Sequence, residues 1–344
     1  MNIKDLFKTL VESQASDLHL AVGLPPMMRV NGKLAPMNGQ VLSDNDITTM
    51  LKEIIPAERA KINPQTEVDL GIEAPNLARF RANIYHDRKG ICAALRLIPS
   101  KIKSLSDLGL PEVVEKIYAM NKGLVLVTGV TGSGKSTTLA SIVDKINSQR
   151  SEHIITIEDP IEFVHEHKKS MVNQREIGAQ TASFADALRA ALREDPNVIL
   201  VGEMRDLDTI SMAVTAAETG HLVLATLHSS NAPDTVNRII DVFPPHQQDQ
   251  IRIQLAESLA MVVSQALLPS IDGSTRFVAC EVMTANTAIK NLIREKQTHQ
   301  IRSAISVSNR DGMQTMDQSI KALFEEGKIS REVALQWMLE KNAL

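Results

Sequence analysis

A glycine-rich segment in the first half of the chain has the residue types and spacing that bind phosphate. Residues 129–136 match the pattern G-x-x-x-x-G-K-[ST]. Glycine permits backbone conformations that turn successive N–H groups inward around an anion. The lysine can reach the outer phosphates and the serine hydroxyl can ligate Mg²⁺. The segment therefore predicts a site for a nucleoside triphosphate and Mg²⁺, formed by Thr131, Gly132, Ser133, Gly134, Lys135, Ser136 and Thr137.

Carboxylates follow two apolar runs that we expect to be buried strands. Glu203 follows the run 197–202, and Glu158 and Glu162 follow the run that begins at Ile155. Ligands of open α/β sheets bind at the carboxyl ends of the strands, so these side chains are candidates for the same site. Glu203 would complete the shell of Mg²⁺ together with Ser136. Either Glu158 or Glu162 would orient the attacking water, and the alternative is that some of these carboxylates only cap or pair at the surface.

One histidine and several arginines could supply the remaining groups that phosphoryl transfer needs. His228 follows the apolar run 222–227 and could donate a hydrogen bond to a γ-phosphate oxygen, although a histidine after a strand is more often structural. Arginines stabilise the charge that develops in the transition state. The amino-terminal part supplies four arginines on adjacent predicted strands: Arg79, Arg81, Arg88 and Arg96. The alternative interpretation is that they form a solvated basic face. Arg79 and Arg81 share one strand face because the side-chain period is two.

The elements that must position these residues alternate along the second part of the chain. Continuous apolar runs predict strands that are covered on both faces, at 124–129, 154–158, 197–202 and 222–227. Helices are predicted between them, at 183–193 and 207–219. This order predicts a doubly wound α/β domain. A long helix at about 246–268 is expected to begin a mostly helical tail that covers about 245–344.

The amino-terminal part predicts a small α+β domain. Apolar periodicity indicates helices at 3–13 and 43–55, the second with Ser43 and Asp46 at capping-box spacing. Strands are expected at 15–20, 67–72, 78–85 and 91–98, and a hairpin at 27–35 turns at Asn31-Gly32. We therefore expect a domain at 1–100, a polar linker at 101–110, a helix from Pro111 to about Met120, and an ATPase domain at 111–344.

The composition of the chain excludes several classes of protein. The chain has 344 residues and a net charge of −4, so the basic footprint of a nucleic-acid binder is absent and no nucleic-acid partner is expected. The two cysteines, Cys92 and Cys280, lie far apart among apolar neighbours, which indicates neither a disulfide framework nor a zinc site. The first residues lack the apolar core of a signal peptide, and the longest nearly apolar run, 259–269, is too short to span a bilayer. These features predict a cytoplasmic protein.

Four of these stretches occur in the order typical of the secretion ATPase superfamily, which powers type II secretion and type IV pili. They are the phosphate loop at 129–136, an acidic stretch at 155–165, a second acidic strand at 197–206 and a histidine stretch at 220–228. Residues 15–20 and 288–295 resemble the pilus-retraction branch, although the third position of the second motif is Lys290 where arginine is usual. The chain has no C-x-x-C pair, whereas pilus-extension and type II secretion relatives usually carry a tetracysteine zinc module.

The resemblance implies a PAS-like amino-terminal domain, a RecA-like ATPase domain, and a cytoplasmic homohexamer that hydrolyses ATP to drive pilus retraction. It implies an inner-membrane platform protein as partner, which would hold the ring at the membrane, and it allows a paralogous retraction ATPase as a second partner. The site residues that it implies are Glu162 as the catalytic glutamate, Glu203 as the Walker B carboxylate, His221 and His228, and the arginines Arg81 and Arg96. The alternatives are an accessory nucleotide-binding subunit, an extension or type II secretion ATPase, and a RecA-like nucleic-acid motor.

Overall fold

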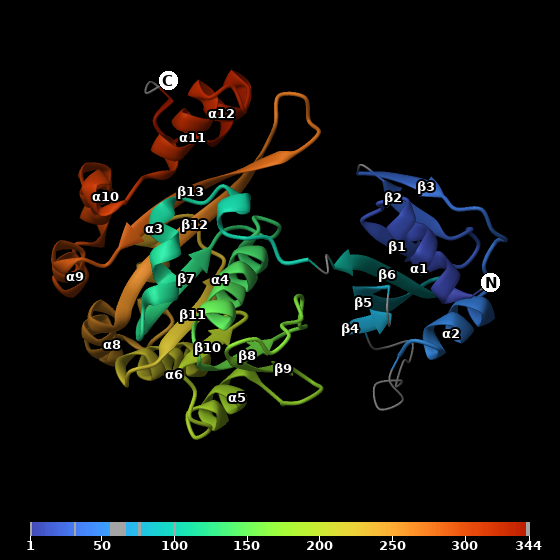
Figure 1. The fold of residues 1–344 in the computed structure, drawn as a ribbon, viewed down its shortest axis with the longest axis horizontal. Coiled ribbons are helices and arrows are strands. Elements are labelled where there is room, and N and C mark those ends of the chain that lie inside the picture. The colour runs from blue at the N-terminus through green and yellow to red at the C-terminus, as the bar shows by residue number, and fades with distance from the viewer. Residues whose placement is uncertain (1, 31, 56–66, 75–76, 99–100, 342–344) are drawn as a thin grey trace. The chain divides into compact units, whose positions relative to one another are not determined.

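The computed structural model describes residues 2–30, 32–55, 67–74, 77–98 and 101–341 (Figure 1). The chain divides into two compact units. The first comprises Met1–Lys101 together with the short segment Asp159–Val164, and the second comprises Ile102–Glu158 and His165–Leu344. Among the described residues, no helix is both long enough and apolar enough to cross a membrane.

The first unit is built on one antiparallel sheet of six strands. The strand order is β3-β2-β1-β6-β5-β4. The strands are β1 Asp17–Leu20, β2 Met27–Val30, β3 Lys33–Pro36, β4 Val68–Ala74, β5 Ala78–Asp87 and β6 Gly90–Ile98. They agree with the strands and the hairpin predicted from the sequence. Asn31 of the predicted turn, and residue 100 before the predicted linker, lie outside the described residues.

Two helices cover one face of this sheet. They are α1 Ile3–Glu12 and α2 Asp44–Lys52, and Ser43 and Asp46 form the predicted capping box at the start of α2. Phe7 of α1 stacks on Phe80 of β5 with ring centroids 4.0 Å apart, inside a core of aliphatic side chains. Because side chains alternate along a strand, the opposite face of the sheet carries the charged residues of β1, β5 and β6.

The second unit is built on a mixed sheet of seven strands. The order is β13-β12-β7-β11-β10-β8-β9, and every neighbouring pair is parallel except β12 with β13. The strands are β7 Gly123–Thr128, β8 His153–Glu158, β9 Met171–Glu176, β10 Val198–Val201, β11 Leu222–Leu227, β12 Leu259–Pro269 and β13 Arg276–Thr284. The four strands predicted from apolar runs are thus confirmed as β7, β8, β10 and β11.

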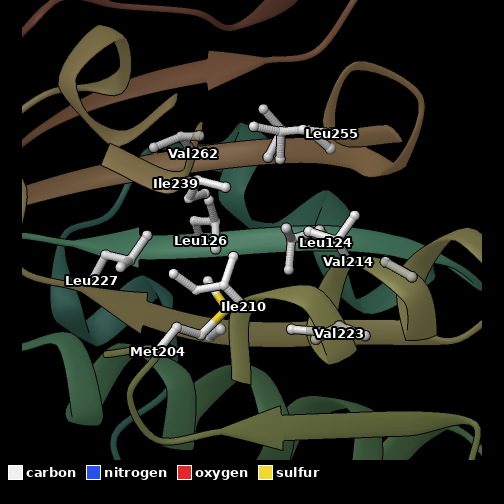
Figure 2. Close-up of a cluster of buried hydrophobic side chains, with 14 of the residues drawn as sticks. Leu124, Leu126, Met204, Ile210, Val214, Val223, Leu227, Ile239, Leu255 and Val262 are labelled. Carbon is white, nitrogen blue, oxygen red and sulfur yellow. The ribbon is translucent and has the colours of Figure 1, made fainter. Parts of the chain in front are cut away.

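Helices cover both faces of this sheet, which confirms the predicted α/β class. On one face lie α3 Glu112–Glu115 and α4 Lys135–Gln149, packed on alternate strand residues such as Val125 and Leu224. Figure 2 shows the other face, where residues such as Leu124, Leu126 and Val223 meet the helices. These helices are α5 Phe184–Ala191, α6 Leu207–Glu218, α7 Ala232–Asp241 and α8 Pro245–Ser258. The helix predicted from Pro111 is interrupted, since α3 continues as a 3-10 turn over Lys116–Ala119.

The prediction of one long helix over 246–268 was wrong. Helix α8 ends at Ser258, and the chain continues as β12, which pairs with β7 on one side and β13 on the other. An apolar run buried on both faces has no periodicity that separates strand from helix, so the sequence pattern could not make this distinction. The tail from 245 is therefore only partly helical, and its later helices are α9 Thr287–Arg294, α10 Ile301–Val307, α11 Met316–Glu325 and α12 Arg331–Trp337.

Candidate nucleotide-binding site

The glycine-rich loop lies where its motif predicts, between the end of β7 at Thr128 and the start of α4 at Lys135. Gly129, Gly132 and Gly134 have φ of 142°, 81° and 92°, a region that residues with a Cβ rarely adopt. A Cβ on Gly129 would also lie 2.4 Å from the carbonyl oxygen of Gln265 on β12. Glycine is therefore required at this position both by backbone conformation and by the close approach of the neighbouring strand.

The positive groups of the loop are positioned for an anion. The amino end of α4 begins inside the loop, so its unpaired N–H groups and its dipole face the space that the loop surrounds. The buried ammonium of Lys135 donates to the carbonyl oxygens of Gly129 and Val130, at 2.8 and 3.1 Å. The hydroxyl of Ser133 is buried without a hydrogen-bond partner in the described part of the chain. These groups can be satisfied by phosphate oxygens.

Sheet topology brings three predicted site segments to one edge. Strand β11 lies between β7 and β10, with Leu227 opposite Thr128 and Ala225 opposite Val201. The three strands are parallel, so the loop after β7, His228 after β11 and Glu203 after β10 all follow carboxyl ends at the same edge of the sheet. The strand assignments made from the sequence predicted that these segments would lie at the same edge.

Glu203 and His228 form a direct pair at this edge. Nε2 of His228 lies 3.1 Å from Oε1 of Glu203, and Nη2 of Arg205 lies 2.7 Å from Oε2 of the same carboxylate. The side chain of Glu203 is 19% exposed. Burial alone would raise the pKa of Glu203, but the hydrogen bonds and charges of Arg205 and His228 outweigh it and hold the pKa below its usual value. Arg205 was not among the predicted site residues, although it lies only two positions after Glu203.

The oxygen donors in this unit fit Mg²⁺. Ser136 opens α4 and Glu203 follows β10, and a hydroxyl with a carboxylate is a donor set that Mg²⁺ accepts while keeping waters and phosphate oxygens. In the residues that the structure describes, no cluster of three or more His, Cys, Asp or Glu side chains could hold a metal ion. A metal at this site would therefore depend on the phosphates of a bound nucleotide.

Glu162 belongs to the segment that packs with the first unit. Nη1 of Arg81 lies 3.6 Å from Oε1 of Glu162, and Nε of Arg79 donates to the carbonyl oxygen of Ile161 at 3.1 Å. Arg81 also donates to both oxygens of Asp69, the shortest contact being 2.7 Å. The hydrogen bonds that Arg81 donates to Asp69 raise the pKa of the Arg81 guanidinium above its usual value. The structure thus joins two predicted site residues, Arg81 and Glu162, that are far apart in sequence.

The other predicted arginines have different surroundings. Nε of Arg96 donates to Oδ1 of the buried Asp17 at 2.9 Å, and Arg81 lies opposite Arg96 in the register of β5 and β6. Arg88 lies in the turn between these two strands, away from the other three arginines. The carboxylates Asp17 and Asp69, which hold Arg96 and Arg81, were not among the predicted site residues, although Asp17 lies in the segment 15–20 that resembles the pilus-retraction branch.

Two predicted site residues have local structural partners instead. Oε1 of Glu158 accepts hydrogen bonds from Thr156 at 2.7 Å and Gln174 at 3.2 Å, which favours a structural role. His221 precedes β11, and its carbonyl oxygen accepts from Gly123 at the start of β7. Strand β11 has six residues, so His221 and the glycine-rich loop are separated by about 20 Å within one chain. The structure therefore does not bring His221 to the loop that it was predicted to serve.

A phosphate loop on a largely parallel sheet, with a carboxylate and an imidazole at the neighbouring strand ends, defines a P-loop nucleotide-binding protein. The model of the Type II/IV secretion system protein family matches residues 2–334, and the chain belongs to this family. The relatives place it among ATPases of this family.

Three relatives are similar along almost the whole chain. The type IV pilus retraction ATPase PilT of Pseudomonas aeruginosa is 48% identical over 335 residues, which is 97% of each protein. A twitching motility protein of Neisseria gonorrhoeae is 50% identical over 310 residues, covering 90% of this chain and 83% of the relative. A crystal structure of the pilus retraction motor PilT with bound ADP superposes with a TM-score of 0.92 at 46% identity, covering 100% of this chain and 99% of that one.

Proposed function

We propose that the chain is an ATP-hydrolysing motor that drives retraction of type IV pili. The observation that carries the proposal is similarity to a pilus retraction ATPase over 97% of both chains, together with a complete phosphate loop at the edge of the sheet. ATP hydrolysis is supported by the carboxylate and imidazole that lie at the same edge. The segment 288–295 lies on α9, Thr287–Arg294, and its C-cap residue, and it keeps a basic residue, Lys290, at its third position.

The second unit binds the nucleotide in this proposal. The N–H groups of the loop and of the first turn of α4 hold the phosphates, and Lys135 exchanges its carbonyl partners for phosphate oxygens. Ser136 and Glu203 hold Mg²⁺, which when bound neutralises charge on the β- and γ-phosphates. His228, already hydrogen-bonded to Glu203, donates to a γ-phosphate oxygen and so couples the presence of that phosphate to the position of the carboxylate.

The first unit and its added segment supply the remaining groups. Glu162 orients the attacking water, and Arg81 and Arg96 stabilise charge on the transferred phosphoryl group. Both arginines have carboxylate partners, Asp69 and Asp17, that fix their side chains on the sheet. Six copies form a ring, and loss of the γ-phosphate shifts the two units as rigid bodies. The ring pulls on an inner-membrane platform protein, and a paralogous retraction ATPase can act beside it.

A deletion strain tests retraction directly. We expect excess surface pili and no twitching motility, restored by the wild-type gene and by Lys296→Ala, an exposed lysine paired with Asp249. Lys135→Ala should not restore motility, because the loop loses its phosphate-binding ammonium. Loss of surface pili in the deletion strain would instead show an extension ATPase.

Purified protein separates the remaining alternatives. A motor hydrolyses ATP by itself, whereas an accessory subunit of a paralogous motor binds ATP with little turnover. Stimulation of turnover by DNA would indicate a nucleic-acid motor, which the net charge of −4 disfavours. Mass photometry of the protein with and without ATP tests the proposed homohexamer.

A further inference from the structure

Both oxygens of the Glu203 carboxylate are already occupied by cationic or hydrogen-bonding partners. Arg205 holds Oε2 at 2.7 Å, which is the distance of a charge-assisted hydrogen bond, and His228 holds Oε1 at 3.1 Å. The side chain of Arg205 is 70% exposed, whereas the side chain of Glu203 is 19% exposed. The exposed side chain of Arg205 therefore pairs with the mostly buried side chain of Glu203, which the proposed function assigns to Mg²⁺.

The backbone on both sides of Arg205 is fixed. The amide of Met204 donates to the carbonyl oxygen of Thr226 on the adjacent strand at 3.1 Å. The side chain of Asp206 caps α6 by accepting from the amide and the hydroxyl of Thr209, at 2.8 and 3.0 Å. With its neighbours anchored to β11 and α6, Arg205 can leave Glu203 only by a movement of its own side chain. Such a movement is fast and needs no rearrangement of the sheet.

We propose that Arg205 is a positioning residue that competes with Mg²⁺ for Glu203, so that binding of the metal with its nucleotide displaces the guanidinium. This inference rests on the proposed function, since it takes Glu203 as part of the metal site. Arg205 and Mg²⁺ are attracted by the same carboxylate charge, and each neutralises the charge that attracts the other. Arg205 thereby keeps the buried carboxylate neutralised while no metal is bound, and it becomes available to phosphate or to an acidic partner once displaced.

The test measures metal affinity rather than turnover. Full-length protein is loaded with ADP, and Mn²⁺ binding is followed by electron paramagnetic resonance. Arg205→Ala should bind Mn²⁺ about three- to tenfold more tightly than wild type, because an ion pair of this strength no longer competes. Arg205→Lys should lie between them, since lysine keeps the charge but not the planar fork. Arg189→Ala, which removes an arginine from an exposed pair with Asp186 on α5, is the matched control and should equal wild type.

A second measurement separates this inference from the proposed function. Binding of a fluorescent ADP in EDTA reports the phosphate loop alone and should change less than about twofold in Arg205→Ala, since the loop's own contacts remain. Unchanged or weaker Mn²⁺ binding in Arg205→Ala, with normal ADP binding in EDTA, overturns the competition and leaves the proposed function standing. Absence of ADP binding in wild type overturns both. Circular dichroism confirms that each variant is folded.

Discussion

Nη1 of Arg81 lies 3.6 Å from Oε1 of Glu162, and the same guanidinium holds both oxygens of Asp69. The two residues assigned to opposite tasks in hydrolysis, stabilising charge and orienting water, are therefore counter-ions in the described first unit and its added segment. A guanidinium that is paired with carboxylates presents less net positive charge to a phosphate. The proposed roles of Arg81 and Glu162 therefore require that this contact be exchanged for contacts with the nucleotide.

Glu162→Gln should keep ATP binding and lose turnover. The amide has the size of the carboxylate but cannot accept a proton, so kcat should fall by about 10²–10⁴. ATPase rates and the affinity for a fluorescent ATP measure the two effects separately. Glu166→Gln, at an exposed position four residues on, is the control and should behave as wild type. Normal turnover in Glu162→Gln would move the role of base to Glu158.

Arg81→Ala should reduce turnover far more than nucleotide binding. Loss of an arginine that stabilises the transition state costs about 10³ or more in kcat, while contacts to the bound ADP are mostly made by the loop. Steady-state ATPase rates and ADP affinity provide the comparison. The matched variant is Arg88→Ala in the turn between β5 and β6, which should retain most of the activity. Equal effects of the two variants would contradict a specific role for Arg81.

Gly129→Ala should destabilise the protein more than Gly132→Ala. At Gly129 a Cβ meets the carbonyl oxygen of Gln265 at 2.4 Å and φ is 142°, so strain and overpacking together cost about 3 kcal/mol. Nothing lies within 4 Å of a Cβ on Gly132, where only the positive φ costs about 1 kcal/mol. Denaturant unfolding of both variants measures the difference. Equal free energies of unfolding would show that β12 moves away from the loop.

His165 should make the protein less stable in acid. Burial lowers its pKa from 6.5 to about 4, with Asp144 opposing this shift and Lys168 adding to it. A group with a lowered histidine pKa is neutral in the folded state, so its contribution is complete above pH 6.5. That contribution is lost as the pH falls from 6.5 toward 4, by at most about 3 kcal/mol. The free energy of unfolding of His165→Gln should fall less over this range, and parallel pH profiles would contradict the prediction.

His221→Ala should leave nucleotide affinity unchanged, because the residue lies at the amino end of β11. Its ring nitrogen Nδ1 contacts the carbonyl oxygen of Ala216 at 2.9 Å, which is a local structural contact. We expect the ADP dissociation constant to change less than about twofold, since no loop contact is lost. His228→Ala, which frees one oxygen of Glu203, should instead lower ATPase activity. A large loss of ADP affinity in His221→Ala would show that a neighbouring copy presents this residue to the nucleotide.

Local patterns predicted most of the second unit. The phosphate loop requires glycines and a lysine at fixed spacing over the eight consecutive residues 129–136, so its conformation is set by neighbours in sequence. Buried parallel strands leave continuous apolar runs, which placed β7, β8, β10 and β11. Strand β12 has the same kind of run but follows a helix without a break, and its pairing with β7 and β13 decided its conformation.

The sequence by itself determined that the chain carries a phosphate-loop motif, where this loop lies and which strand ends could face it. Tertiary structure decided which charged side chains form pairs. The pairing of Glu203 with His228 and Arg205, and of Glu162 with Arg81, depends on strand order and side-chain position in space. Tertiary structure also placed His221 far from the loop. His221 precedes β11 and the loop lies near the other end of this six-residue strand. Residue types indicate possible chemistry, whereas register and packing determine which of those groups come within bonding distance.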